Sequence, residues 1–189
     1  MADTGAVAAG AAVSAADLAV IAAQLGRAPR GVAGVARRGA CGCPQVVMNA
    51  PVVAGNDGEQ LFPTLYWVSC PKLAGMLGRL EADGWLARVQ DLLDNDLAFS
   101  DALARAHRRY ASLRRRALGR KARHRLRARA ADRAAVIDGT GVGGTRTLRH
   151  VKCLHAHYAH WLATGRDPVG AMLVSLLWND TSARCRIYK

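Results

Sequence analysis

Hydrophobic residues recur at helical spacing in two stretches of the first half of the chain. The first stretch follows Ser14, which opens an S-x-x-D pattern typical of a helix capping box, and it ends at Gly26. The second begins at Pro71, a residue favoured at the first position of a helix, and ends at Gly84. Both stretches therefore predict amphipathic helices, and a further helix is expected over residues 85–95.

Three short runs rich in β-branched and aromatic residues lie between these helices, over residues 31–38, 44–51 and 62–69. Glycine-containing turns at 39–43 and 54–60 separate the runs. Because consecutive strands joined by short turns usually pair with one another, the runs predict a small antiparallel three-stranded meander. The predicted fold class is α+β, with this meander packed against several helices.

The second half of the chain is mainly helix-forming. Residues 97–135 predict a long Arg-rich helical segment with a thin apolar seam, interrupted at Gly119. A glycine-rich loop over 138–145 leads into a helix expected over 148–163, and the apolar run MLVSLLW predicts a short final helix. We expect a disordered tail, a single domain and a C-terminal tail, over residues 1–13, 14–178 and 179–189 respectively.

The net charge of +13 is concentrated in one part of the chain. Between Arg105 and Arg133 there are thirteen Lys or Arg residues and one acid, Asp132, which gives +12 locally and leaves +1 for the remainder. Clustered cations attract polyanions by counterion release, but no aromatic residue for base stacking lies between Ala111 and Ala135. We therefore expect weak, non-specific binding to nucleic acid or polyphosphate, with a solvated helix face as the alternative. The expected anion-binding residues are Arg114, Arg115 and Arg116.

The loop DGTGVGGT contains a formal G-x-G-x-x-G pattern that begins at Gly139. A dinucleotide-binding fingerprint needs a strand before the glycines and an acidic residue about twenty positions later. Here a basic helix precedes the loop, and Asp167 falls in a terminal turn, so this interpretation is not favoured. An anion site at the start of the following helix is the alternative to a flexible connection. The basic residues beside it are Arg146, Arg149 and Lys152.

The stretch VKCLHAHYAHWLA, residues 151–163, places a cysteine and three histidines within eight positions. On a helix, Cys153 shares one face with His157 and His160, whereas His155 points to the opposite side. Zinc usually takes about four nitrogen or sulfur ligands, so the group favours a metal site if other cysteines converge on it. A packing face rich in histidine is the alternative.

The other cysteines lie far from this stretch along the sequence. Cys41 and Cys43 share a tight turn between the first two predicted strands, and Cys70 immediately precedes Pro71. A helix N-terminus favours thiolate, the form that binds metals or attacks substrates. No pair has the C-x-x-C spacing typical of zinc ribbons or iron–sulfur proteins, and buried structural cysteines remain the alternative. Cys185 is expected to be incidental.

The sequence shows no membrane-spanning segment and no secretory signal, and this bears on the cellular compartment of the protein. No stretch is apolar enough to span a membrane, and the first residues have no basic cluster of the kind found in secretory signals. We therefore expect a cytoplasmic protein, in which the cysteines are free thiols or metal ligands.

Four segments resemble an actinobacterial family, namely LAVIAAQLGRAPRGVAGVARR, CGCPQVVMNAP, LFPTLYWVSCP and GVGGTRTLRHVKCLHAHYAHWLA. The family is catalogued as domain of unknown function 501, and the resemblance covers residues 17–170. Its C-x-C-G-x-P turn aligns with Cys41, Gly42 and Pro44, while Gly39 stands in place of the first cysteine. The resemblance implies no established activity. It points to Cys41, Cys70, Cys153, His155 and His160 as site residues.

These observations lead to one predicted site. Helical geometry selects His157 and His160, the resemblance selects His155 and His160, and His160 satisfies both. The predicted zinc ligands are Cys41, Cys70, Cys153 and His160, with an iron–sulfur cluster as the alternative cofactor. His155 and His157 are second choices, as ligands or as supports for the ligands. His155 becomes the ligand if its helix begins later than expected.

The alternative function is a cysteine-dependent enzyme. Cys70 would be the nucleophile, and His155 or His160 would be the base. No acidic or amide residue that would orient this base is identifiable from the sequence.

Overall fold

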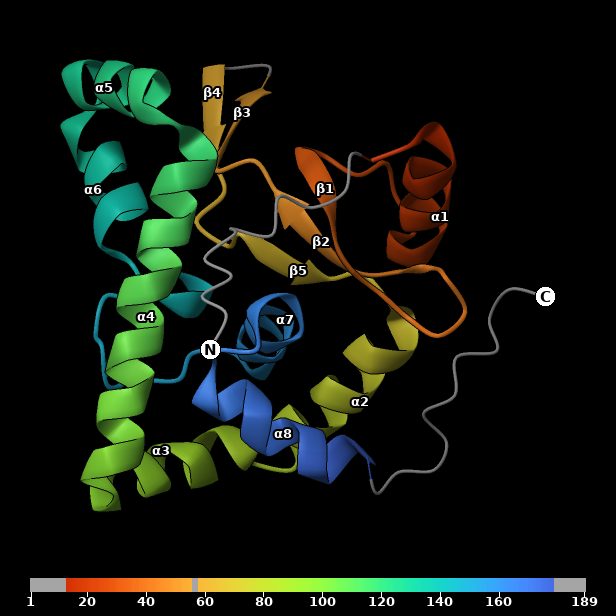
Figure 1. The fold of residues 1–189 in the computed structure, drawn as a ribbon, viewed down its shortest axis with the longest axis vertical. Helices are drawn as coiled ribbons and strands as arrows, with labels where there is room; N and C mark the ends of the chain where they lie inside the picture. The colour runs from red at the N-terminus through yellow and green to blue at the C-terminus, as the bar shows by residue number, and fades with distance from the viewer. Residues whose placement is uncertain (1–12, 56–57, 179–189) are drawn as a thin grey trace, which may run out of the picture.

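A small antiparallel sheet lies near the centre of the protein, with helices around it (Figure 1). The computed structural model describes residues 13–55 and 58–178, so the tail predicted over 179–189, with Cys185, and all but the last residue of the tail predicted over 1–13 lie outside the described residues. The strands are β1 (Val32–Arg38), β2 (Pro44–Asn49), β3 (Val52–Gly55), β4 (Gly58–Leu61) and β5 (Tyr66–Val68).

Helices make up most of the rest of the described chain, and none of them has both the length and the apolar character needed to cross a membrane. The N-terminal half contains α1 (Ala15–Leu25), α2 (Pro71–Ala82) and α3 (Trp85–Asn95). The basic segment contains α4 (Leu97–Leu118), α5 (Arg120–Arg129) and α6 (Ala131–Gly139). A short 3-10 turn, η1 (Val142–Gly144), precedes α7 (Leu154–Thr164) and α8 (Pro168–Trp178).

The predicted α+β class and the three-stranded antiparallel sheet are confirmed. The strand order is β1-β2-β5, and Val47 of β2 pairs with Val35 on one side and Trp67 on the other. The turn expected at 54–60 is part of a separate hairpin, because β3 and β4 pair antiparallel. The third strand of the sheet is therefore shorter than the predicted 62–69, and it begins only after the hairpin has ended.

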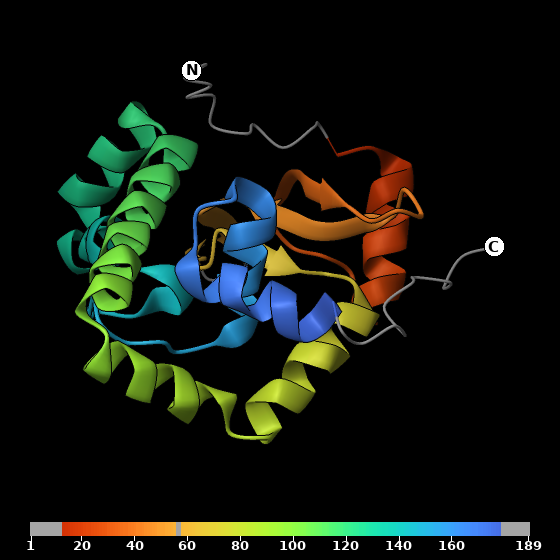
Figure 2. The same ribbon diagram turned by 60° about the horizontal axis from the view of Figure 1, so that its bottom comes forward.

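The two faces of the sheet have different surroundings. On one face α7 packs on β5, and together with α2, α4 and α8 it encloses the main apolar core (Figure 2). Helix α1 contacts β2 from the other face. Because side chains alternate along a strand, Tyr66 and Val68 are buried in the main core, while Trp67 between them is 43% exposed on the opposite face.

Helix α7 begins six residues later than the predicted 148 because the preceding chain is held in a turn. Gly143 and Gly144 adopt positive φ angles of 67° and 76°, and Gly141 N donates to Thr145 O at 2.7 Å. Cys153 is extended, with φ −159° and ψ 122°, and serves as the N-cap residue. The helix therefore starts directly after Cys153, and His155 lies in its first turn.

The basic segment is a set of three helices at one side of the molecule (Figure 1). The predicted interruption at Gly119 separates α4 from α5, and a second break at Ala130, with φ −155°, separates α5 from α6. Asp138 near the end of α6 lies 2.7 Å from Arg123 Nε and 2.6 Å from Arg127 Nη2. Part of the positive charge of the segment therefore holds α5 against α6.

Candidate functional site

The end of α2 and the start of α7 bring three potential metal ligands together. Glu81 comes from the last turn of α2, Cys153 precedes α7, and His155 is the second residue of α7. One ligand atom from each side chain lies within 4.8 Å of the other two, and all three residues are partly exposed. Within the described part of the chain, this is the group of Cys, His and acidic residues that meets this distance. We call it the Glu-Cys-His group.

Backbone groups hold this arrangement in place. Glu81 Oε1 accepts a hydrogen bond from Leu154 N at 2.7 Å, so the carboxylate caps the N-terminus of α7, where Cys153 makes no side-chain capping bond. His155 donates from Nε2 to Ala74 O at 3.0 Å, while its Nδ1 lies 3.2 Å from Glu81 Oε1. Helix α2 thus supplies two contacts that fix the imidazole ring.

The electrostatics of the Glu-Cys-His group favour an ionised pair. The hydrogen bond with the Cys153 side chain, and then the contacts with Glu81 and Ala74, outweigh partial burial and raise the pKa of His155 to about 9. Burial acts to raise the pKa of Glu81, but the hydrogen bonds from His155 and Leu154 outweigh it and lower the pKa below its usual value. At neutral pH the group therefore presents a carboxylate beside an imidazolium.

The four predicted ligands occupy different environments. Cys41 is exposed in the turn between β1 and β2, whereas Cys70 is the N-cap residue of α2 and only 3% exposed. His160 is fully buried in the middle of α7, and Cys153 lies at its start. Among the described residues, no three of these four have ligand atoms that all lie within 4.8 Å of one another. The structure instead places Cys153 with His155, the second-choice ligand, and with Glu81.

His157 and His160 share a helical face, as predicted, but the group that they contact is a carboxylate. Asp167 Oδ2 accepts hydrogen bonds from His157 Nδ1 and His160 Nδ1, each at 2.9 Å, and all three side chains are fully buried. Asp167 Oδ1 also accepts from Gly170 N at 2.9 Å, so the same residue caps α8. Burial acts to raise the pKa of Asp167, but the two histidines outweigh it and hold the pKa well below its usual range.

A third buried histidine extends this cluster. His107 of α4 accepts a hydrogen bond at Nδ1 from Val142 N at 3.0 Å, and its ring lies edge-on to that of His157 at 5.4 Å. Burial, and then the nearby His157, lower the pKa of His107 to about 4. A Cβ atom at Gly141 would lie 2.4 Å from His107 Nδ1, so only glycine fits there. Glycine in the predicted G-x-G-x-x-G loop therefore allows close packing on a histidine.

The predicted anion-binding residues differ in exposure. Arg114 is 0% exposed, and its guanidinium donates to the carbonyl oxygens of residues 63, 136, 137 and 140 at 2.5–3.2 Å. The prediction that Arg114 binds an external anion is therefore corrected, because its donors are used within the fold. Arg116 is exposed, and Arg115 donates to Asp138 O at 2.9 Å. The loop residues Arg146, Arg149 and Lys152 are exposed, with Arg149 Nη2 3.4 Å from an oxygen of Asp101.

Sequence reasoning missed Glu81 and Asp167 as site residues. Asp167 does carry a local signal, because an aspartate immediately before Pro168 is typical of an N-cap residue followed by the first helical residue. That signal marks the start of α8 but says nothing about the two histidines. Glu81 carries none, since a charged residue at the end of an amphipathic helix is ordinarily solvated.

The fold and these groups define a small α+β protein with a partly exposed Glu-Cys-His group and a buried cluster, in which two histidines bond to one aspartate and a third histidine packs against one of the two. The family model described as a protein of unknown function (DUF501) matches residues 35–175, and the chain belongs to this family. The resemblance of the sequence segments to domain of unknown function 501 is thereby confirmed. No curated protein and no solved structure matches the chain.

Proposed function

We propose that the protein is a metal-binding domain that holds zinc at the Glu-Cys-His group. The observation that supports this proposal is the convergence of Glu81, Cys153 and His155 to within 4.8 Å of one another. Thiolate, imidazole and carboxylate are all zinc ligands, whereas magnesium and calcium prefer oxygen alone. Three protein ligands leave a fourth tetrahedral position for water or a substrate.

Zinc suits this group better than the iron–sulfur cluster considered as the alternative. Clusters are usually held by several cysteine thiolates, and the group offers only Cys153. A thiol that binds zinc must stay reduced, so the proposal includes a reducing compartment such as the cytoplasm. His155 would lose its proton on binding the metal, because only the neutral imidazole is a ligand.

Protein produced anaerobically with zinc supplied is expected to contain about one zinc per chain. Replacing Cys153 with serine or His155 with alanine removes one ligand, so each variant should retain less than about a tenth of the metal after dialysis against a weak chelator. Elemental analysis by mass spectrometry measures the content. The exposed Cys41→Ser variant is the matched control and should keep its zinc. A wild-type content below a few tenths of a metal per chain contradicts the proposal.

A cysteine-dependent enzyme is the second candidate, with a different nucleophile from the one predicted. Cys70 is buried, so its thiol is not accessible to a substrate. Cys153 is partly exposed, has a hydrogen bond with His155, and has Glu81 positioned to orient that histidine. A thiol beside an imidazole is the pairing of nucleophile and base that cysteine-dependent enzymes use. Metal-free protein in which iodoacetamide labels Cys153 faster than Cys41, with the excess lost in His155→Ala, would favour the enzyme over the zinc site.

We also propose weak, non-specific polyanion binding, now assigned mainly to α5. Several basic side chains of α5 line a shallow depression of about 600 Å³. Arg123 and Arg127 of this set are paired with Asp138. In the part of the chain that the structure describes, Arg125 and Arg129 are exposed and have no ion-pair partner. Such unpaired cations release counterions when they contact phosphates.

Neutralising these two cations should flatten the salt dependence of binding. The Arg125→Gln/Arg129→Gln variant is expected to lose up to about 1.8 in the log–log slope of duplex DNA affinity against salt concentration. Fluorescence anisotropy at several salt concentrations measures the slope. The control variant Arg37→Gln/Arg166→Gln removes the same charge from exposed positions outside the basic segment and should leave the slope nearly unchanged. Equal effects of the two variants, or no binding at low salt, would show that α5 is only a solvated surface.

A further inference from the structure

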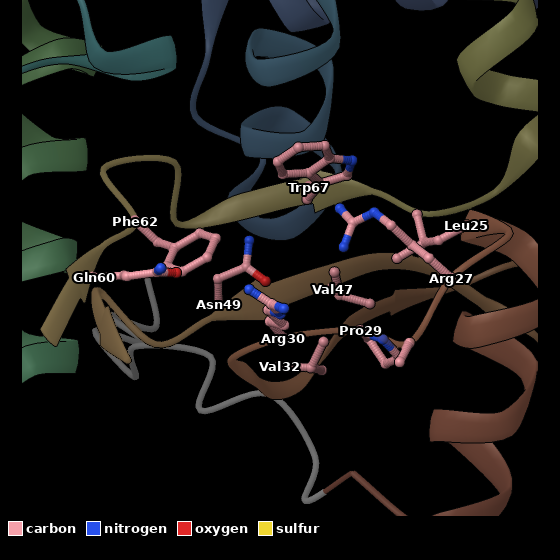
Figure 3. A pocket seen from close by; sticks show the side chains of 11 residues that line it. Leu25, Arg27, Pro29, Arg30, Val32, Val47, Asn49, Gln60, Phe62 and Trp67 are labelled. Atoms are coloured by element: carbon pink, nitrogen blue, oxygen red, sulfur yellow. The ribbon is translucent and has the colours of Figure 1, made fainter. Parts of the chain in front are cut away.

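A second cavity lies on the face of the sheet that α7 does not cover. It has a volume of about 440 Å³, within the usual range of small-molecule sites. Its walls come from the end of α1, the connection that leads to β1, all three strands of the sheet, β4, and the β4–β5 connection (Figure 3). The residues used in the argument below are Arg27, Arg30, Asn49, Gln60, Phe62 and Trp67. We call this cavity the sheet pocket.

Strand geometry explains the floor of the sheet pocket. Val47 pairs with Trp67, and Val32 pairs with Asn49, so these cross-strand neighbours project from the same face. Val47 and Asn49 are two positions apart on β2, which places both pairs on one side of the sheet. Trp67 is the large exposed aromatic residue of this face, and Figure 3 shows Phe62 at the opposite end of the pocket from Leu25.

The charges around the sheet pocket are all of one sign. Arg27 and Arg30 line it, and none of its lining residues is acidic. Both arginines are exposed, and in the described part of the chain neither guanidinium has a hydrogen-bond or ion-pair partner. Figure 3 shows the two guanidinium groups reaching towards the space between Phe62 and Leu25. A ligand would therefore meet two unpaired cations beside two aromatic rings.

Polar side chains complete the lining. Asn49 is held by a hydrogen bond from its Nδ2 to Thr64 O at 3.2 Å, which fixes its amide in one orientation. Gln60 lies beside Phe62 at the same end of the pocket. Amide side chains of this kind bind the edges of nucleobases, because each offers both a donor and an acceptor.

We propose that the sheet pocket binds a nucleobase carrying a phosphate, with the base stacked on Trp67 and the phosphate bound by Arg27 and Arg30. Arginine forms bidentate hydrogen bonds with phosphate oxygens, and exposed aromatic rings stack on bases of any sequence. A small inorganic anion could not stack on Trp67, and an aliphatic ligand could not form ion pairs with the two arginines. The inference does not depend on zinc, since none of the Glu-Cys-His residues lines this pocket.

The test is calorimetric titration of the intact protein with AMP, adenosine and ribose 5-phosphate. AMP is expected to bind at least about tenfold more tightly than either fragment, because only AMP engages both the rings and the arginines. Trp67→Ala should weaken AMP binding about tenfold, and Trp67→Phe, which keeps a ring, should weaken it less. Equal affinity for AMP and ribose 5-phosphate, or no AMP binding at millimolar concentration, overturns the proposal.

Two charge variants separate a local phosphate site from general attraction. Arg27→Gln/Arg30→Gln should weaken AMP binding at least about tenfold, whereas Arg125→Gln/Arg129→Gln, with the same loss of charge on α5, should not. Equal weakening by both variants would contradict a built phosphate site. A 5′-phosphorylated tetra-adenylate tells the two sources of this chemistry apart. If the protein binds the tetranucleotide and AMP with equal affinity, the natural ligand is a free nucleotide. If it binds the tetranucleotide more tightly than AMP, and the α5 variant loses this difference, the natural ligand is a single-stranded nucleic acid.

Discussion

Replacing Arg114 with alanine is expected to lower the free energy of unfolding by about 3–5 kcal/mol. The guanidinium donates to the carbonyl oxygens of residues 136, 137 and 140 around the end of α6, and to Pro63 O beyond the β3–β4 hairpin. The last carbonyls of a helix have no partner within the helix, so without Arg114 the carbonyl oxygens of Ile137 and Thr140 would lose the donors that satisfy them, whereas Val136 O would keep its bonds from Thr140. Arg114 therefore joins α4, α6 and the start of the β4–β5 connection.

Urea unfolding followed by circular dichroism measures this effect. The Arg116→Ala variant is the control, because Arg116 is an exposed neighbour on the same helix and should change the free energy of unfolding by less than about 0.5 kcal/mol. Arg114→Lys should fall between the two, since an ammonium group cannot reach four carbonyl groups in the planar geometry of a guanidinium. An Arg114→Ala variant as stable as Arg116→Ala would show that the buried bonds contribute nothing net.

Replacing Asp167 with alanine is expected to destabilise the protein by a similar amount, about 3–5 kcal/mol. The carboxylate accepts hydrogen bonds from His157, His160 and Gly170 N, and none of the side chains involved is exposed to water. Its removal leaves two buried imidazole N–H groups unpaired and takes the cap from α8. The Nε2 atoms of both histidines already lack a hydrogen-bond partner within the described residues, so the bond to Asp167 is the one side-chain hydrogen bond that each ring makes there.

Thermal unfolding of Asp167→Ala should show a midpoint lowered by roughly 10 °C, which is the shift that this loss implies for a chain of this size. Asp167→Asn keeps the shape and one acceptor but places an NH2 group against a histidine donor, so it should recover only part of the loss. The exposed Asp91→Ala variant should unfold close to the wild-type temperature. A midpoint for Asp167→Ala within a degree of that control is incompatible with the role assigned to the carboxylate.

Much of the fold follows from local signals in the sequence. The capping box at Ser14 is formed, with Asp17 N donating to Ser14 Oγ at 3.0 Å, and Pro71 starts α2 as predicted. These signals act within one turn of a helix, so a single sequence contains all of the required information. The late start of α7 has a different origin. The turn that delays it depends on His107 binding Val142 N, and these residues are 35 positions apart.

The same distinction explains the candidate site. The sequence identifies Cys153 and His155 as chemically interesting, but their partner Glu81 comes from another helix and is 72 positions away from Cys153. Helical spacing correctly places His157 and His160 on one face, yet the spacing is the same for a metal, a carboxylate or an apolar partner. Only tertiary packing determines which group contacts the two histidines. Asp167 contacts them because α8 folds back on α7.

Several arginines of the basic segment form bonds within the fold, and this affects how the protein would approach a charged partner. Arg114, Arg115, Arg123 and Arg127 bond to groups within the fold, so the outward-facing cations of the basic segment lie along α5 and the exposed side of α4. Both views place α5 at one extremity, far from α2 (Figures 1 and 2). Positive charge gathered on the side of the molecule formed by α4 and α5 gives it an electric dipole moment. The field of a distant polyanion would therefore exert a torque on the protein and turn α5 forward before any contact is made.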